Sequence, residues 1–196
     1  MSAYERLKER YELGQVPWDH ELPPPEVLTE LADMVPGRAL DLGCGYGRAA
    51  IYMGQLNWQV DGVDFIDLAL QEATRRAAQV GVSEQVRFYH TAVTHMPALS
   101  GPYDFALDVG CMHNFNAAEM RAYHGELCRL LRTGALYLLF AHVRGDDEED
   151  DGRWIDEQEL LTLFNDGFTL EKVEHGLTQV EDRPAWHSAW FWFRRA

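Results

Sequence analysis

Three glycines at alternate positions follow an acidic residue near residue 40. The stretch reads Asp41-Leu42-Gly43-Cys44-Gly45-Tyr46-Gly47 and leads into a helix-forming segment at residues 48–55. Glycine leaves backbone amides bare, so a loop of this kind lets a ligand come close to the chain. A dinucleotide pyrophosphate requires G-x-G-x-x-G, and Arg48 stands where the third glycine of that pattern belongs. The Asp41 carboxylate would repel a pyrophosphate, and it favours a ligand that is positively charged at this point.

A second acid follows the next predicted strand. Asp64 comes directly after the apolar segment at residues 59–63, close to the ~20-residue spacing at which an acid of a Rossmann-type fold meets ribose hydroxyls. A carboxylate can accept two hydroxyl hydrogen bonds at once, so we interpret Asp64 as a ribose ligand. The alternative is that it caps the helix that begins at Ile66. Phe65 is a candidate to pack on a purine ring or an ordinary core residue.

These residues resemble motif I of the class I S-adenosylmethionine-dependent methyltransferases, D-x-G-x-G-x-G after the first strand of a Rossmann-like sheet. The resemblance covers about residues 38–195. It implies an α/β fold with a seven-stranded, mostly parallel sheet, helices on both faces, and a last strand that runs antiparallel between its neighbours. More narrowly, G-x-x-P-W-D at residues 14–19 and D-V-G-C-M-H at residues 108–113 look like the bacterial small-molecule methyltransferases related to thiopurine and tellurite-resistance methyltransferases.

The resemblance implies roles for residues at the carboxyl ends of the strands, where open α/β sheets bind their ligands. Asp41 and the Gly43 backbone would lie near the methionine amino group of S-adenosylmethionine, and residues 108–110 would line its methionyl side. Family members often place an acid near Ala92 for the adenine amino group, which this chain lacks, so backbone groups of Ala92 and Val93, or a nearby threonine hydroxyl, would replace it. The implied cofactor-binding residues are Trp18, Asp41, Gly43, Cys44, Gly45, Gly47, Asp64, Phe65, Ala92, Val93, Asp108 and Gly110.

Methyl transfer from a sulfonium needs no obligatory catalytic side chain, because the protein mainly has to align the reacting atoms. Where the acceptor must lose a proton, His113 is the candidate base by position and by the ordinary pKa of histidine, with His20 and Asp19 next. His113 could equally be a hydrogen-bonded structural residue. The candidate substrate residues are Tyr11, Asp19, His113 and Trp154, which together with Trp18 and Phe115 would give an aromatic pocket for an apolar or soft acceptor.

Alternating strand and helix patterns position these residues. The apolar periodicity predicts a strand in the apolar run from Ala39 that leads into the glycine loop, and further strands over residues 59–63, 86–90, 103–109, 135–143, 168–175 and 185–194. It predicts helices over residues 3–13, 26–35, 48–55 and 66–79, a helix that runs through residues 120–131 and ends at 132–134, and one over residues 156–164. Residues 15–25 are too rich in proline for regular structure and form either a linker or a lid that brings Trp18 to the glycine loop. We divide the chain into an N-terminal helical cap or lid, residues 1–37, and a methyltransferase domain, residues 38–196, within one compact domain.

Composition limits the function classes. The 196 residues are 46% apolar and carry a net charge of −15, which disfavours the phosphate contacts of nucleic-acid binding and favours a small-molecule substrate. Without a long apolar run or an apolar N-terminal core, the chain is expected to be a cytoplasmic protein with no membrane contact. The three cysteines lack the spacing of a disulfide framework or zinc site, and the acidic run at residues 146–151 lacks a calcium-loop pattern, so we expect no metal.

Two other functions remain open at this stage. A nicotinamide-dependent oxidoreductase is opposed by Arg48, and a non-catalytic protein that senses S-adenosylmethionine or S-adenosylhomocysteine would carry the same cradle. Methylation of nucleic-acid bases is disfavoured because the stretch after residue 107 reads Asp-Val-Gly-Cys in place of the proline-containing motif of DNA amino-methyltransferases. The sequence leaves the acceptor and the oligomeric state open.

Overall fold

The computed structural model describes residues 2–145, 154–179 and 185–196. These residues form two compact units, Met1–Val93 and Thr94–Ala196. The predicted cap at residues 1–37 lies within the first unit, and its separate role stays a prediction. The acidic run at residues 146–151, predicted to be a solvated loop, lies outside the described residues.

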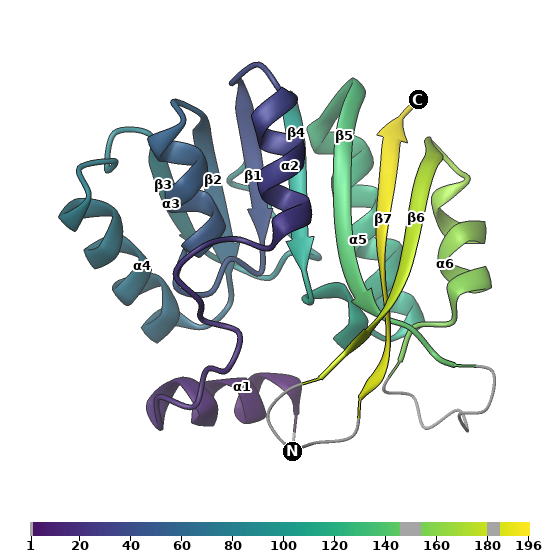
Figure 1. Ribbon diagram of the computed structural model, residues 1–196, viewed down its shortest axis with the longest axis horizontal. Helices are drawn as coiled ribbons and strands as arrows, with labels where there is room; N and C mark the ends of the chain where they lie inside the picture. Colours follow the sequence, from purple (N-terminus) through teal and green to yellow (C-terminus); the bar gives the residue numbers. More distant parts are fainter. Residues whose placement is uncertain (1, 146–153, 180–184) are drawn as a thin grey trace. The chain divides into compact units, whose positions relative to one another are not determined.

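Seven strands form one sheet in the order β3-β2-β1-β4-β5-β7-β6 (Figure 1). The strands are β1 (Arg38–Leu42), β2 (Gln59–Asp64), β3 (Val86–His90), β4 (Tyr103–Val109), β5 (Leu131–His142), β6 (Phe168–Thr178) and β7 (Trp186–Arg195). The pairs β1–β2, β2–β3 and β4–β5 are parallel, whereas β7 is antiparallel to both β5 and β6. With helices on both sides of the sheet, this arrangement confirms the predicted fold class.

The first unit surrounds strands β1 to β3 with four helices. They are α1 (Ala3–Glu12), α2 (Pro25–Asp33), α3 (Arg48–Gln55) and α4 (Asp67–Gln79). Helix α1 begins in a capping box, in which the Ser2 hydroxyl accepts from the Glu5 amide while the Glu5 carboxylate accepts from the Ser2 amide. It lies at the end of the unit toward which β1 points (Figure 1). The parallel register between β1 and β2 places the glycine loop and Asp64 at the carboxyl ends of adjacent strands.

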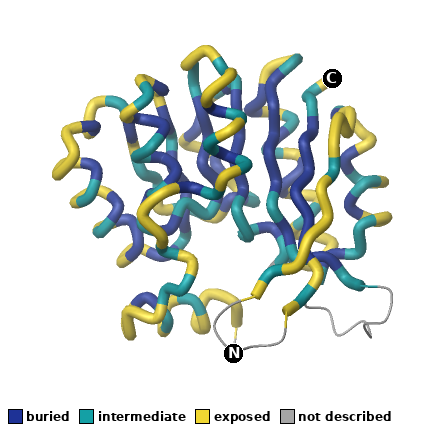
Figure 2. Tube along the Cα trace, viewed as in Figure 1, coloured by how far each residue is buried: buried dark blue, intermediate teal, exposed yellow. Residues whose placement is uncertain are grey.

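The second unit holds strands β4 to β7, helices α5 (Ala117–Leu130) and α6 (Glu157–Phe164), and a short 3₁₀ helix η1 (Met112–Asn114). Its core is aromatic, with Tyr137, Phe164 and Phe193 stacked on one another and wholly buried. Strands β4, β5 and β7 are mostly buried, whereas β6 is largely exposed (Figure 2).

Several predicted element boundaries differ from the structure, and two helices end at least two residues earlier than predicted. Helix α5 ends at Leu130 rather than within residues 132–134, because Leu131 pairs with Tyr103 and opens strand β5 before a shift of register in that pairing. Helix α2 ends at Asp33, which leaves Val35 outside the helix and 88% exposed. Both errors occur where apolar residues continue a helical pattern beyond the point at which the backbone turns.

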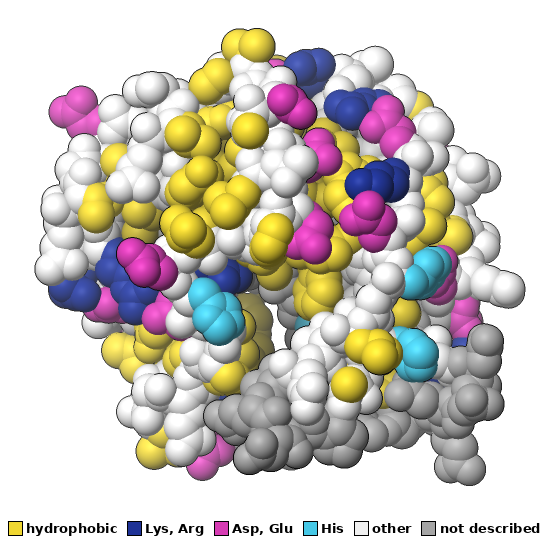
Figure 3. Space-filling model, viewed as in Figure 1, with side chains coloured by type: hydrophobic (Ala, Val, Ile, Leu, Met, Phe, Trp, Pro, Cys, Tyr) yellow, Lys and Arg dark blue, Asp and Glu magenta, His cyan; other side chains and the backbone are white. Residues whose placement is uncertain are grey.

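None of the described helices has the length and apolar character that a membrane-spanning helix requires. On the face shown in Figure 3, Lys and Arg side chains lie beside Asp and Glu side chains.

Candidate active site

The glycine loop after β1 adopts the conformation that its sequence predicts. Gly43, Gly45 and Gly47 have φ angles of 68°, 54° and 77°, in the left-handed region that side chains disfavour. The Cys44 amide donates to the Val63 carbonyl at 3.0 Å, which ties the loop to the end of β2. The loop therefore turns sharply from β1 into α3 while it stays attached to the neighbouring strand.

Asp64 joins the loop to the next strand. Its side chain is 6% exposed, and its two oxygens accept from the Gly45 amide at 2.9 Å and from the Ile66 amide at 2.8 Å. Burial raises the pKa of Asp64, and the hydrogen bonds from backbone amides oppose that rise. A carboxylate has about four acceptor positions, and the amides of Gly45, Phe65 and Ile66 act on it, so it retains acceptor capacity for a ribose hydroxyl. The bond to Ile66 is not a helix cap, because Ile66 itself is the N-cap residue of α4 and no side-chain cap hydrogen bond is formed there.

The Asp41 carboxylate accepts a hydrogen bond from α3 and not from the glycine loop. The carboxylate is 4% exposed, and one oxygen accepts from the Ala50 amide at 3.0 Å, in the first turn of α3. Because Gly47 precedes that helix and has no side chain, Asp41 satisfies an amide that a capping residue would otherwise satisfy. Asp41 also favours the charged form of Arg48, although burial lowers the pKa of that guanidinium more strongly. The predicted contact of Asp41 with the methionine amino group stays a prediction.

Helix α1 contacts the glycine loop through Tyr11, which is 6% exposed. Its hydroxyl lies so close to Gly45 that a β-carbon there would be 2.8 Å from the oxygen. The Tyr11 ring meets Tyr46 edge-on at 5.1 Å, and the Trp18 indole donates to the Tyr11 hydroxyl at 3.3 Å. Tyr11, predicted from the sequence to contact substrate, therefore lies in the first unit against the predicted cofactor loop.

The segment between α1 and α2 is fixed to α4. Both carboxylate oxygens of Asp19 accept from Arg76 at 2.8 Å, and the Arg76 guanidinium lies 4.6 Å from the centre of the Tyr46 ring. Trp18 is 39% exposed and packs on Tyr11, with Arg10 over its ring. The predicted substrate contact of Asp19 and cofactor contact of Trp18 are not tested by this geometry and stay predictions.

The predicted adenine-side residues also lie in the first unit. Phe65 is half-buried and packs beside α1, with its ring centre 5.7 Å from that of Tyr4. After β3, the Thr91 amide donates to the Asp64 carbonyl at 3.1 Å, Ala92 is exposed and Val93 is buried. The structure thus brings Gly43, Gly45, Asp64 and Phe65 together on neighbouring strand ends.

In the second unit, Asp108 is buried inside the protein and not directed into an open site. It is 0% exposed, and its oxygens accept from the Cys111 amide at 2.7 Å, the Met112 amide at 3.1 Å and the Tyr123 hydroxyl at 2.8 Å. Burial raises the pKa of Asp108 to about 7 against the effect of these hydrogen bonds. The carboxylate thereby holds the turn that carries Gly110 and His113. Any contact of residues 108–110 with the cofactor stays a prediction and would have to use the backbone.

His113 stacks on a second histidine that the sequence analysis missed. The rings of His113 and His142 are 4.2 Å apart and nearly parallel, and the His142 amide faces His113 Nδ1 at 3.5 Å. The His113 lone pair that a general base would use therefore already faces a backbone donor. Burial lowers the pKa of His142 to about 4, so this imidazole is neutral at physiological pH. The catalytic role of His113 stays a prediction.

Two tryptophans complete this aromatic cluster. Trp154 and Trp186 stack with their ring centres 6.0 Å apart, and each meets His142 edge-on at 5.2 Å. Trp154 was predicted as a substrate residue, whereas Trp186 and His142 were missed. The sequence did contain a signal for His142, which is a polar residue at the carboxyl end of a long apolar strand, where ligands bind.

Comparisons with known proteins bear on the chemistry of these residues. A family model described as a methyltransferase domain matches residues 39–134. A 2-heptyl-1-hydroxyquinolin-4(1H)-one methyltransferase of Mycobacteroides abscessus is 25% identical over 160 residues, which are 80% of this chain and 70% of the relative.

Solved structures share the fold. The Burkholderia thailandensis 1,6-didemethyltoxoflavin-N1-methyltransferase, solved with bound 1,6-didemethyltoxoflavin and S-adenosylhomocysteine, has a TM-score of 0.76 at 21% identity, covering 98% of this chain and 86% of its own. TehB from Haemophilus influenzae has a TM-score of 0.76 at 15% identity, covering 89% of this chain and 63% of its own. The chain thus contains a methyltransferase domain and shares its fold with solved methyltransferases.

This methyltransferase is an enzyme, and its cofactor is S-adenosylmethionine, as the sequence predicted. The matched residues 39–134 contain the glycine loop, Asp64 and Asp108. The nicotinamide-dependent oxidoreductase and the non-catalytic sensor are therefore not supported.

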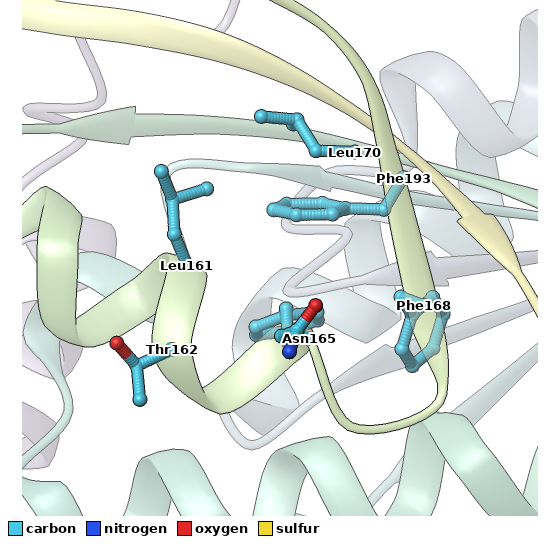
Figure 4. A pocket seen from close by; sticks show the side chains of 7 residues that line it. Leu161, Thr162, Asn165, Phe168, Leu170 and Phe193 are labelled. Carbon is cyan, nitrogen blue, oxygen red and sulfur yellow. The ribbon is translucent and has the colours of Figure 1, made fainter.

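A separate hollow of about 370 Å³ lies between α6 and the edge of the sheet in the methyltransferase (Figure 4). Leu161, Leu170 and Phe193 project into it, and its lining residues include no ionisable side chain. It offers packing surface but no group for methyl transfer.

Neither thiol nor metal chemistry is apparent in the part of the methyltransferase that the structure describes. Cys44, Cys111 and Cys128 are not in disulfide bonds. Across residues 2–145, 154–179 and 185–196, no three His, Cys, Asp or Glu side chains cluster as metal ligands would.

Proposed function

We propose that the enzyme methylates a small-molecule acceptor and that the glycine loop and Asp64 of the first unit hold S-adenosylmethionine. The observation that carries the proposal is the 2.9 Å hydrogen bond between the Gly45 amide and Asp64. It brings together the two signals on which the sequence analysis depended, the bare amides of the loop and the acid of the next strand. The hydroxyquinolinone acceptor of the Mycobacteroides abscessus relative supports an acceptor of small size.

The residues of the first unit fit this cofactor. The left-handed glycines let the loop turn with its amides bare, buried Asp64 retains acceptor capacity for a ribose hydroxyl, and the aromatic rings of Tyr11 and Tyr46 border the loop. The negative charges of Asp41 and Asp64 favour a ligand with ammonium and sulfonium groups. The remaining predicted contacts, from Trp18, Cys44, Gly47, Phe65, Ala92, Val93, Asp108 and Gly110, belong to the same proposal.

When bound, S-adenosylmethionine supplies a methyl group on a positively charged sulfur that leaves as a neutral thioether. The protein's tasks are to hold the cofactor, to orient the acceptor and to exclude water. Buried Asp64 and Tyr11 serve the first task. The half-buried aromatic side chains around His142 are proposed to serve the second.

Calorimetric titration of the purified chain tests the cofactor assignment. S-adenosylhomocysteine should bind with one site per chain, whereas NAD and NADP should not bind. Binding of a nicotinamide nucleotide without a response to S-adenosylhomocysteine would refute the proposal. Methylation by the wild-type enzyme of one member of a panel of thiols, phenols, amines and short oligonucleotides would then separate small-molecule acceptors from nucleic acid.

A further inference from the structure

Trp186 carries a hydrogen-bond donor that nothing in the described protein satisfies. Its Nε1 atom is buried and makes no hydrogen bond to any residue in the ranges 2–145, 154–179 and 185–196. A buried donor without a partner costs about 1–3 kcal/mol. The neighbouring indole of Trp154 stacks on Trp186 with the ring centres 6.0 Å apart, within the ordinary range for aromatic pairs, and does not pair with this donor.

His142 offers a second unused polar edge beside this donor. The ring lies between the stacked His113 and the two indoles, and neither of its nitrogens makes a hydrogen bond to a described residue. Because burial holds the pKa of His142 near 4, the ring is uncharged at neutral pH and presents one N–H and one lone pair. A donor and an acceptor thus lie within one aromatic cluster at the end of β5.

We propose that His142 and Trp186 form the polar edge of a subsite for a flat aromatic acceptor that carries a hydroxyl or thiol group. The acceptor's ring would stack on the tryptophan and histidine faces, and its oxygen or sulfur would accept from Trp186 Nε1 and pair with His142. An aliphatic molecule of equal size would lose the stacking, and an aromatic molecule without the polar group would leave the donor unpaired. This inference rests on the proposed function, because it names the acceptor class of the same reaction.

The position of the cluster in the second unit agrees with an acceptor subsite. His142 ends β5, and His113 follows the parallel strand β4, so both histidines lie at carboxyl ends of strands, where open α/β sheets place their ligands. The Asp108 carboxylate holds the turn before His113 through the Cys111 and Met112 amides, which gives the cluster one rigid wall. A rigid wall orients a flat ring better than a mobile one.

The test measures binding of 1-naphthol to the full chain in the presence of S-adenosylhomocysteine. Decahydro-1-naphthol lacks the aromatic ring, and 1-methylnaphthalene lacks the hydroxyl. We expect 1-naphthol to bind at least fivefold more tightly than either analogue. The variant Trp186→Phe keeps an aromatic ring but removes the donor, so it should weaken 1-naphthol about fivefold to tenfold and leave 1-methylnaphthalene unchanged.

Trp190→Phe is the matched control, because Trp190 lies on the same strand but packs on Phe140 outside the tryptophan pair. It should bind all three probes as the wild type does. His142→Phe is a second variant in case Trp186→Phe fails to fold, and it should also weaken 1-naphthol selectively. Equal binding of 1-naphthol and its analogues by the wild type, absence of 1-naphthol binding, or selective loss in Trp190→Phe alone would overturn the proposal.

S-adenosylhomocysteine affinity separates the two proposals. If S-adenosylhomocysteine binds equally to the wild type and the variants, but 1-naphthol binding does not show the expected selectivity, the proposed subsite is wrong and the cofactor assignment stands. If S-adenosylhomocysteine fails to bind to the wild type, the proposed function itself fails.

Discussion

Asp41 and Asp64 show how two similar residues come to differ in function. Both are buried at the ends of adjacent parallel strands. Asp41 directs an oxygen to the start of α3, whereas Asp64 accepts from Gly45 within the glycine loop itself. Substitution of Asp41 should therefore reduce stability through the lost bond to α3, and substitution of Asp64 should reduce cofactor affinity through the lost ribose contact.

Replacement of Asp64 by alanine measures its part in cofactor binding. Asp64→Ala should weaken S-adenosylhomocysteine binding by about 1.5–3 kcal/mol, the range for hydrogen bonds to a charged group. Asp67→Ala, at the start of α4 and exposed, is the control and should leave the affinity unchanged. Calorimetry on variants whose circular dichroism matches the wild type checks this, and unchanged affinity in folded Asp64→Ala would show that the ribose lies elsewhere.

The buried Asp108 makes stability depend on pH. Its pKa is raised to about 7 from an ordinary 3.8, so the native state holds its proton more tightly than the unfolded chain does. The resulting stability is fully present below about pH 4 and is lost as the pH rises through about 7. In urea denaturation, the wild type's unfolding free energy relative to Asp108→Asn should therefore be lower at pH 8 than at pH 5. The matched comparison with exposed Asp67→Asn should show no such change, and a larger wild-type advantage at pH 8 would contradict the assignment.

At the scale of elements, α1 packs on the first unit with one buried side chain, Tyr11, and with Leu7 partly buried beside it. Tyr11 is the buried residue of this helix, and it packs with Ile66 and Ala69 at the start of α4. Asp19 and Arg76 fix the segment that follows. Removal of the Tyr11 side chain should therefore loosen α1.

Hydrogen exchange tests the attachment of α1. Tyr11→Ala should make amide exchange over residues 3–12 about tenfold faster or more, because burial of an aromatic side chain contributes about 1.5–3 kcal/mol. Tyr4→Ala removes a 46% exposed ring from the same helix and should have a smaller effect. Equal exchange rates in the two variants would show that Tyr11 does not hold the helix.

Replacement of two helical glycines by alanine should change the stability of the protein in opposite directions. A β-carbon at Gly54 in α3 would lie 2.6 Å from Val86 Cγ2, whereas one at Gly125 in α5 would meet nothing within 4 Å. Gly54→Ala should destabilise the protein by about 1–3 kcal/mol through overpacking against β3. Gly125→Ala should stabilise it by about 0.5–1 kcal/mol, because alanine has the higher helix propensity. Urea denaturation at one pH measures both, and the same sign for the two variants would refute the packing of α3.

At the scale of the whole molecule, the fold was predictable because its signals are local. Short sequence patterns of a few residues each identify the glycine loop, Asp64 and the apolar strands. The surroundings of Asp108 were not predictable, since Tyr123 approaches it from another element. His142 and Trp186 were missed for the same reason, because only pairing of β5 with β7 brings them together.

The net charge of −15 also acts on the molecule as a whole. Repulsion from phosphates should prevent binding to duplex DNA even at low ionic strength, where electrostatic binding is strongest. A gel-shift titration with a random 30-base-pair duplex at roughly 50 mM salt should show no complex. A protein–DNA complex that dissociates as salt is added would indicate a basic surface and a nucleic-acid partner.

The order of strands in the second unit affects how the protein folds during translation. Strand β7 lies between β5 and β6, yet both of those are synthesised before it. Until Trp186–Arg195 has emerged from the ribosome, β5 and β6 each have an edge without a partner strand. Unpaired strand edges can pair with other nascent chains and lead to aggregation. Chaperone demand should therefore peak late in synthesis of this protein.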